Sequence, residues 1–159
     1  MIGETVSREE ASRQVKLALR RLAMYHGAMV EVMKEELGEA AGRALAEKVA
    51  DRYGSMVGLA ALARAEEAGK SNDLANYAED LPGLGFDMEK TSDDPLTVRV
   101  HGCPLAQTWR EMGCQADGAI YCRVDQAKYL AYNPAITCCH RVHAIKDDSP
   151  FCELTMEQA

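Results

Sequence analysis

The spacing of hydrophobic residues divides the chain into a helical first half and a mixed second half. Ser7 and Glu10 have the spacing of a helix capping box, and hydrophobic residues then recur at near-helical intervals, which predicts a helix over 7–37. Beyond Gly38, a segment rich in alanine, leucine, glutamate and arginine predicts a second helix over 39–68. The apolar stripes of these helices should lose contact with water by packing together. The residues expected in this core are Leu19, Leu22, Leu45, Val49 and Met56.

Shorter segments complete the first half. A third, short helix is expected over about 71–80, before a cluster of glycine and proline. The polar, turn-rich segment Phe86–Pro95 predicts a connector between the two halves. The chain has the length of one typical domain, so we expect a single domain over 1–159, with 1–81 as its helical half.

The second half mixes strand and helix signals. The alternating, β-branched segment 96–100 predicts a strand, and a glycine, cysteine and proline turn leads from it into a helix that ends at about Met112. A further helix is expected over about 119–132, ended by an Asn-Pro pair. Strands over 136–145 and 151–156 would form a hairpin. The pattern predicts an α+β fold in which long N-terminal helices pack against a small, mostly antiparallel sheet with two further helices.

Charge excludes several classes of partner. The formal net charge is −7, and the basic residues are interspersed with acidic ones, which argues against a nucleic acid or an anionic membrane surface as partner. No apolar run approaches the roughly 20 residues that span a bilayer, and residues 1–4 lack the pattern of a signal peptide. We therefore expect a cytoplasmic protein with a small-molecule partner. The N-terminal helices are the expected contact surface of a homodimer.

Cysteine and histidine are concentrated in the second half, over 96–157. Three of the four histidines lie there, and so do all the cysteines: Cys103, Cys114, Cys122, Cys138, Cys139 and Cys152. In a protein that is not exported, such a cluster indicates metal binding, reactive thiols or simple filling of the core rather than a disulfide framework.

One candidate for chemistry is the junction that contains His101 and Cys103. The helix that follows has unpaired backbone N–H groups at its start, which favour a thiolate or a bound anion. This arrangement can activate Cys103. The alternative is that Cys103 is a small buried hydrophobic residue beside a structurally useful turn.

A second candidate is the pair Cys122 and Asp125. The two residues lie three apart on a predicted helix, so they share a face and could form the wall of a pocket. The alternative is that Asp125 is solvated or pairs with Lys128 or Arg123.

A third candidate is a zinc site formed by Cys122, His140, His143 and Cys152, which are ligand types that suit this ion. Residues three apart on a regular strand point to opposite faces, so His140 and His143 need a bulge to bind one ion. The alternative is that these are hydrogen-bonded strand histidines and core cysteines.

Four short motifs in the second half together resemble the L-2-amino-thiazoline-4-carboxylic acid hydrolase family. These are a Cys-Pro turn, a Cys-x-x-Asp helix, an Asn-Pro stop and a hairpin that ends in cysteine. They correspond here to Cys103-Pro104, Cys122-Arg-Val-Asp125, Asn133-Pro134 and Asp148-Ser-Pro-Phe-Cys152. The resemblance covers roughly residues 97–156 and implies a hydrolase that opens a small ring containing sulfur and nitrogen.

The same section also resembles the vinyl-reductase type of small-molecule-binding domain, in which a helix and a hairpin hold a metal. Cys122, His140, His143 and Cys152 fall near those ligand positions. Two histidines replace a carboxylate and a thiol, and Asp147 stands where a glycine is usual. This resemblance implies the alternative function, a small-molecule or metal-binding module that catalyses nothing.

The hydrolase reading allows two mechanisms. In the first, Cys103 attacks the amidine-like carbon, His101 or His140 moves the proton, and Asp125 orients the substrate's amino group. In the second, a metal activates water, which requires that one of the four candidate ligands leaves a coordination position open. A redox or metal-trafficking role for Cys138 and Cys139 is less favoured, since adjacent residues of a strand face opposite ways.

The topology also predicts where the site lies. The strand that leads into Cys103 and the hairpin after the Asn-Pro pair should join one sheet, because consecutive elements commonly pack as neighbours. We therefore expect Cys103, Cys122, Asp125 and His140 to line one cavity between the two C-terminal helices and the hairpin.

Overall fold

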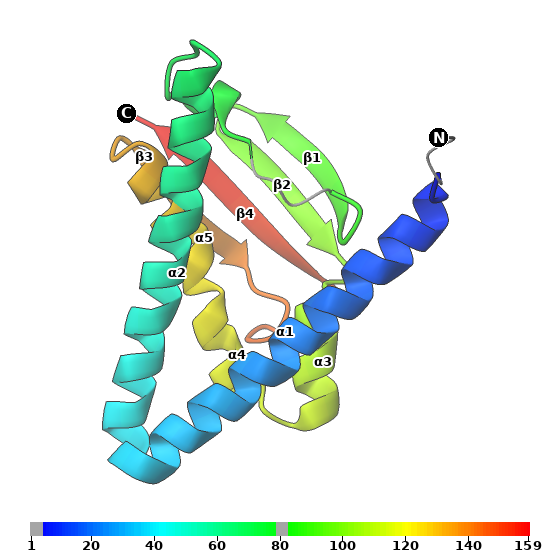
Figure 1. Ribbon diagram of the computed structural model, residues 1–159, viewed down its shortest axis with the longest axis vertical. Coiled ribbons are helices and arrows are strands. Elements are labelled where there is room, and N and C mark those ends of the chain that lie inside the picture. The colour runs from blue at the N-terminus through cyan, green and yellow to red at the C-terminus, as the bar shows by residue number, and fades with distance from the viewer. Residues whose placement is uncertain (1–4, 79–82) are drawn as a thin grey trace.

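Two long helices form the two arms of a V on one side of the molecule (Figure 1). The computed structural model describes residues 5–78 and 83–159. Helix α1 spans Arg8–Leu37 and α2 spans Glu39–Glu67. The side chain of Ser7 accepts a hydrogen bond from the Glu10 amide at 3.1 Å, so the predicted cap of α1 is confirmed.

The described residues contain a four-stranded antiparallel sheet, which lies behind the helix pair in the order β1-β2-β4-β3 (Figure 1). Its strands are β1 (Asp87–Asp93), β2 (Leu96–His101), β3 (Ile136–Val142) and β4 (Phe151–Gln158). Strand β2 pairs with β4 from Leu96 opposite Met156 to His101 opposite Phe151. The predicted α+β class, with an antiparallel sheet against long N-terminal helices, is confirmed.

The segment Phe86–Pro95 was expected to be a connector, but most of it forms strand β1, so this expectation is wrong. Residues 87–93 pair with β2, from Asp87 opposite His101 to Asp93 opposite Leu96. The strand lies at an edge of the sheet and most of its side chains are exposed, so polar residues are tolerated on both of its faces. Residues 87–93 do not alternate between apolar and polar, so their sequence does not predict a strand.

The second half contains three helices in the described chain rather than two. Helix α3 spans Pro104–Met112, α4 spans Gln115–Tyr121 and α5 spans Arg123–Tyr132. The helix predicted over 119–132 is therefore wrong at its start, because the helix is interrupted at Cys122, which separates α4 from α5. Helix α3 packs on α1, and α5 packs on both α2 and β3.

Three smaller boundaries also differ. The third helix expected over 71–80 is a single 3-10 turn, η1 (Leu74–Asn76), and residues 79–80 lie outside the described residues. Strand β3 ends at Val142 instead of Ile145, since its register with β4 shifts between His140 and Val142. Strand β4 continues two residues beyond its predicted end.

The core of the helix pair differs most from expectation. Leu19 is buried and Leu22 half-buried, but Leu45, Val49 and Met56 are exposed, so the stripe assigned to α2 is wrong. The buried face of α2 consists instead of small residues: Gly42, Ala46, Ala50, Gly54, Gly58, Ala61 and Ala65. A Cβ atom added at Gly58 would lie 2.0 Å from the carbonyl oxygen of Lys128. Glycine there lets the backbones of α2 and α5 approach closely.

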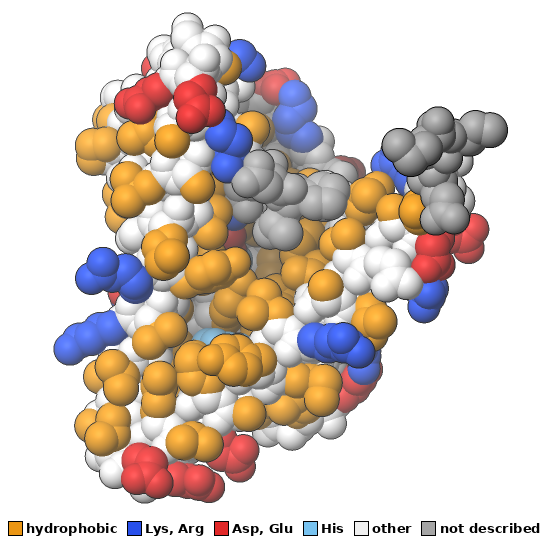
Figure 2. All heavy atoms as spheres, viewed as in Figure 1, with side chains coloured by type: hydrophobic (Ala, Val, Ile, Leu, Met, Phe, Trp, Pro, Cys, Tyr) orange, Lys and Arg blue, Asp and Glu red, His pale blue; other side chains and the backbone are white. Residues whose placement is uncertain are grey.

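Several large apolar side chains of α2 are instead exposed to solvent. Met56 and Leu59 are 61% and 55% exposed, and hydrophobic side chains are visible along both arms in Figure 2. The homodimer through these helices stays a prediction.

No helix in the described ranges combines the length and apolar character needed to cross a bilayer. Residues 1–4, where the sequence showed no signal-peptide pattern, lie outside the described residues.

Contacts between the two halves fix the helix pair on the rest of the molecule. The indole N–H of Trp109 donates a hydrogen bond to the Ala23 carbonyl at 2.9 Å, and both residues are buried. Asp117 of α4 accepts from Lys34 at 2.9 Å and from Arg43 at 2.7 Å, which ties the tip of the V to the second half.

Candidate active site

A cavity of about 420 Å³ lies between the arms of the V, the helices of the second half and the sheet. Figure 2 shows the surface hollowed between α1 and α2, with hydrophobic side chains around the hollow. Its apolar walls come from both halves of the chain, and they include Leu19, Leu22, Tyr53, Val57, Val98, Val100, Trp109 and Leu154. The volume lies in the range of small-molecule sites.

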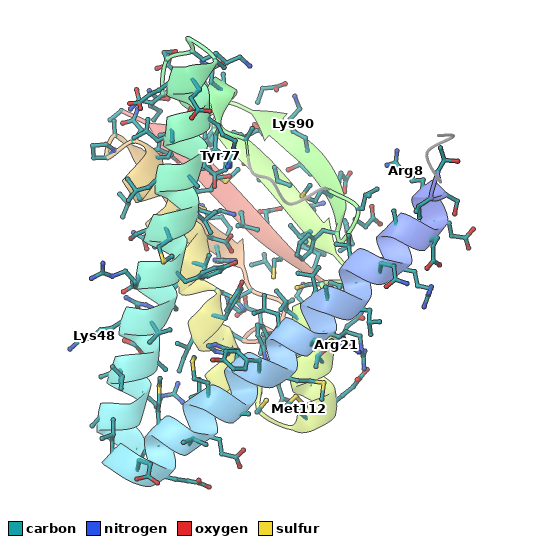
Figure 3. All side chains as sticks on the ribbon, in the orientation of Figure 1. Arg8, Arg21, Lys48, Tyr77, Lys90 and Met112 are labelled. Atoms are coloured by element: carbon teal, nitrogen blue, oxygen red, sulfur yellow. The ribbon has the colours of Figure 1, made fainter. Side chains whose placement is uncertain are left out.

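An aromatic group borders the cavity near the C-terminal end of α2. The ring of Tyr77 packs 4.4 Å from that of Tyr129 and 5.1 Å from that of Tyr132, measured between centroids. In Figure 3, Tyr77 lies on the side of α2 that faces the sheet, whereas Lys48 points away from it. Tyr77 and Tyr129 both line the cavity.

Cys103 reaches the cavity from the junction of β2 and α3. Gly102 has φ +56°, a conformation that favours glycine, and this turn places Cys103 at the N-cap of α3. Burial raises the pKa of the Cys103 thiol, and the amides of Leu105 and Ala106 at the start of α3 only partly oppose this. Cys103 is therefore a neutral thiol at pH 7.

Cys122 lies between α4 and α5, and Asp125 lies in the first turn of α5. Asp125 Oδ1 lies 2.9 Å from Lys128 Nζ, and its Oδ2 lies 3.4 Å from His140 Nε2. Burial raises the pKa of Asp125, but the charge of Lys128 and the contact with His140 outweigh it, so the net shift is downward. The two alternatives considered for Asp125 therefore both hold, because it pairs with Lys128 and also lines the cavity.

His140 and His143 lie on one side of β3 because the strand is bulged. The register shift between His140 and Val142 leaves Arg141 as the extra residue, which turns His143 toward the face that His140 occupies. The two imidazole centroids are 4.9 Å apart. Burial lowers the pKa of His143 to about 4, with a further contribution from His140, so this imidazole is neutral at pH 7.

Three of the four expected metal ligands form a cluster. The ligand atoms of Cys122, His140 and His143 all lie within 4.8 Å of one another. Cys152 lines the same cavity but is not in this cluster, and its sulfur accepts a hydrogen bond from the Ala144 amide at 3.2 Å.

The structure does not bring His101 to the cavity. The side chain of His101 is half-exposed at the end of β2, where its Nε2 lies 3.4 Å from Glu89 Oε2 and its ring packs on Phe151. By contrast, Cys103, Cys122, Asp125 and His140 all line one cavity, as the topology predicted.

Sequence reasoning missed Lys128 as part of the site and missed the whole N-terminal wall. From the sequence, Lys128 was expected only as an ion-pair partner of Asp125. Its spacing of three residues from Asp125 puts it on the same helix face, and this is the signal that could have identified it as part of the site. Leu19 and Leu22 of α1 and Tyr53 and Val57 of α2 carry no motif, so only the tertiary packing identifies them.

These groups suit a small ligand with an apolar body and a cationic or hydrogen-bonding end. The walls are mostly hydrophobic, while Asp125, Lys128 and the two histidines occur together on one side. The side chains of Asp125 and His140 are only 26% and 17% exposed, so charge-assisted contacts there are stronger than on the open surface.

A family model described as L-2-amino-thiazoline-4-carboxylic acid hydrolase matches residues 14–155. The match extends over both long helices as well as the cysteine- and histidine-rich half, and it favours the hydrolase reading over a binding module. No curated protein and no solved structure gives a significant match to the chain.

Proposed function

The chain belongs to the L-2-amino-thiazoline-4-carboxylic acid hydrolase family, and we propose on this basis that it hydrolyses a small cyclic amidine of the 2-aminothiazoline-carboxylate type. One observation carries the proposal: residues from three separate segments, Cys103, Asp125 and His140, meet in one apolar cavity. Such convergence of polar groups in an otherwise hydrophobic pocket is typical of an active site.

Asp125 is the expected partner of the substrate's amidine group. Its lowered pKa keeps the carboxylate ionised at neutral pH. A carboxylate accepts several hydrogen bonds, so Asp125 can keep its contacts with Lys128 and His140 while it binds the N–H groups of the ligand. This interaction would orient the ring carbon between sulfur and nitrogen toward the polar side of the cavity.

The reaction is the addition of water to that ring carbon. The adduct collapses by breaking one ring bond: cleavage of carbon–sulfur releases a thiol, and cleavage of carbon–nitrogen releases an amine. In either case one water molecule is consumed and no oxidant or reductant is needed. Because burial keeps Cys103 protonated, attack by water is favoured over attack by a resting Cys103 thiolate.

The test is to incubate the purified full chain with L-2-amino-thiazoline-4-carboxylate and to separate the products by chromatography with mass detection. We expect a product heavier by one water, and a thiol assay on the protein-free filtrate will identify which bond breaks. Absence of turnover by the folded protein would refute the proposal.

Asp125→Asn provides the matched test of the binding residue. Loss of one charge-assisted hydrogen bond should lower kcat/KM by about 10- to 100-fold. Asp148→Asn is the control, because the side chain of Asp148 is fully exposed and the residue does not line the cavity. Equal activity of the two variants would exclude Asp125 from substrate binding.

A further inference from the structure

We propose that Cys122, His140 and His143 bind a divalent ion of the zinc type and leave one coordination position open. The three side chains come from the α4–α5 break and from the bulged end of β3. Thiol sulfur and imidazole nitrogen are the ligand atoms that zinc prefers in proteins.

The geometry of the cluster fits an ion with little rearrangement. The three ligand atoms lie within 4.8 Å of one another. In a tetrahedral zinc site with ordinary bond lengths, ligand atoms are about 3.5 Å apart. The ligand atoms therefore need to approach one another by no more than about 1.3 Å to coordinate one ion.

His143 gives an independent indication of a ligand. The side chain is buried, and among the described residues neither of its ring nitrogens has a hydrogen-bond partner. Buried polar groups in native proteins are nearly always paired, so two unpaired nitrogens on one imidazole need an explanation. A metal ion satisfies one of them by accepting its lone pair.

His140 has the surroundings of a metal-binding histidine. Its Nε2 faces Asp125 Oδ2 at 3.4 Å, so the other ring nitrogen remains for an ion. Metal-binding histidines commonly donate their second N–H to a carboxylate, which fixes the tautomer and the ring orientation. Asp125 is then a positioning residue for His140 as well as a substrate contact.

Cys152 does not complete the ligand set. Its sulfur accepts the Ala144 N–H and lies outside the cluster, so three protein ligands remain. Three ligands with an open fourth position are the pattern of catalytic rather than structural zinc sites. On binding, the Cys122 S–H bond breaks, a sulfur–metal bond forms, and the proton passes to solvent.

The proposed metal binding does not depend on the proposed hydrolysis. A role of the ion in activating water rests on the proposed function, since the open position would face the cavity that holds the substrate. Binding itself needs only the three side chains. Metal content and turnover are therefore measured separately.

The experiment uses the full chain, purified with a chelator under reducing conditions and then loaded with Zn²⁺ or Co²⁺. We expect one ion per chain after desalting, and for Co²⁺ the absorption bands of a tetrahedral site together with a thiolate charge-transfer band. Cys122→Ser should lose the charge-transfer band, and His143→Gln should weaken binding by at least about 10-fold.

Two control variants share the residue types but lie outside the cluster. Cys139→Ser changes an exposed thiol of the same strand, and His101→Gln changes a histidine outside the cavity. Both should bind the ion like the unmodified chain, and Cys152→Ser should keep one ion and the charge-transfer band. Circular dichroism verifies that each variant is folded.

The inference is overturned if the folded, unmodified chain binds no ion, and this outcome does not depend on any variant. It is also overturned if Cys122→Ser and His143→Gln retain unaltered binding, or if Cys152→Ser alone removes the charge-transfer band. A metal-loaded protein without turnover would refute the hydrolase proposal and leave the metal site intact. Turnover by the metal-free protein would exclude a role of the ion in hydrolysis, and the measured ion content would still decide whether the three side chains bind metal.

Discussion

Cys103 occupies the position of a nucleophile but has the surroundings of a protonated thiol. Burial raises its pKa, and the charge of Asp125 adds to this effect. We expect Cys103→Ser to keep kcat within about tenfold of the unmodified chain, because water rather than this sulfur attacks the substrate. Steady-state kinetics on the substrate named above provides the measurement.

A larger effect would assign Cys103 the opposite role. If the serine variant is folded and loses several orders of magnitude in rate, Cys103 is the nucleophile. Cys139→Ser is the matched control, since it replaces an exposed thiol elsewhere on the sheet. A trapped covalent adduct on Cys103 in the mass spectrum would support the same conclusion.

His26 makes the stability of the helix pair depend on pH. The residue is buried, its Nε2 lies 3.1 Å from the Asp117 carbonyl oxygen, and its ring packs edge-on against Trp109 and Tyr121. Burial lowers the pKa of His26 below its value in the unfolded chain, although the Asp117 carbonyl and carboxylate oppose this. As pH falls below about 6.5, the unfolded state binds a proton that the folded state resists, and the free energy of unfolding decreases.

Denaturant unfolding at about pH 7 and pH 5 will measure this effect. We expect the loss of stability between the two pH values to be smaller in His26→Gln, which can still donate to the Asp117 carbonyl. His26→Phe should be less stable at both pH values because it lacks that donor, but it should show the same reduced pH dependence. An unchanged pH dependence in both variants would contradict the assignment.

At the residue scale, the sequence identified most of the polar site and none of its apolar walls. Helical spacing brought together Cys122 and Asp125, and the requirement for a bulge stated how His140 and His143 could meet. The bulge itself could not be predicted, because it depends on the pairing of β3 with β4. His101 was misplaced for a related reason: strand pairing with β1 directs it toward Glu89.

At the scale of elements, hydrophobicity alone chose the wrong face of α2. Leu45, Val49 and Met56 form the more hydrophobic stripe, yet glycine and alanine form the buried one. Close backbone packing against α5 gains contacts that depend on small size, and a pattern based on apolar character does not detect them. Polar β1 escaped prediction likewise, because an edge strand needs no buried face.

Gly58 provides the test of this close packing. Gly58→Ala should destabilise the protein by about 1–3 kcal/mol, since the added Cβ would meet the Lys128 carbonyl and overpack the interface. On an exposed helix the same change would be stabilising by up to about 1 kcal/mol. The sign of the change in unfolding free energy therefore distinguishes the two environments.

Gly27→Ala is the matched control for this experiment. Its added Cβ would approach the terminal methyl group of Met112 at 3.1 Å, and a flexible side chain can move aside. We expect Gly27→Ala to cost clearly less than Gly58→Ala when both are measured by urea unfolding. Equal costs would show that α2 and α5 are less tightly packed than the structure indicates.

At the scale of the whole molecule, the cavity depends on both halves of the chain. The polar groups come from the second half, whereas Leu22 of α1 and Tyr53 of α2 close the opposite side. The helical half contains no recognisable motif, so its part in the site could not be predicted. The family match over 14–155 is consistent with one unit that includes both long helices.

This dependence predicts that the two halves unfold together. Trp109 is the only tryptophan; it lies in the second half, is 1% exposed, and donates its indole hydrogen bond to Ala23 of α1. Its fluorescence therefore reports the contact between the halves, while far-UV circular dichroism reports mainly the long helices. In a two-state transition different probes give coincident curves, so we expect the two midpoints in urea to agree. A fluorescence change that clearly precedes the loss of helix would show that α1 and α2 persist as a separate unit, and would contradict the single domain expected over 1–159.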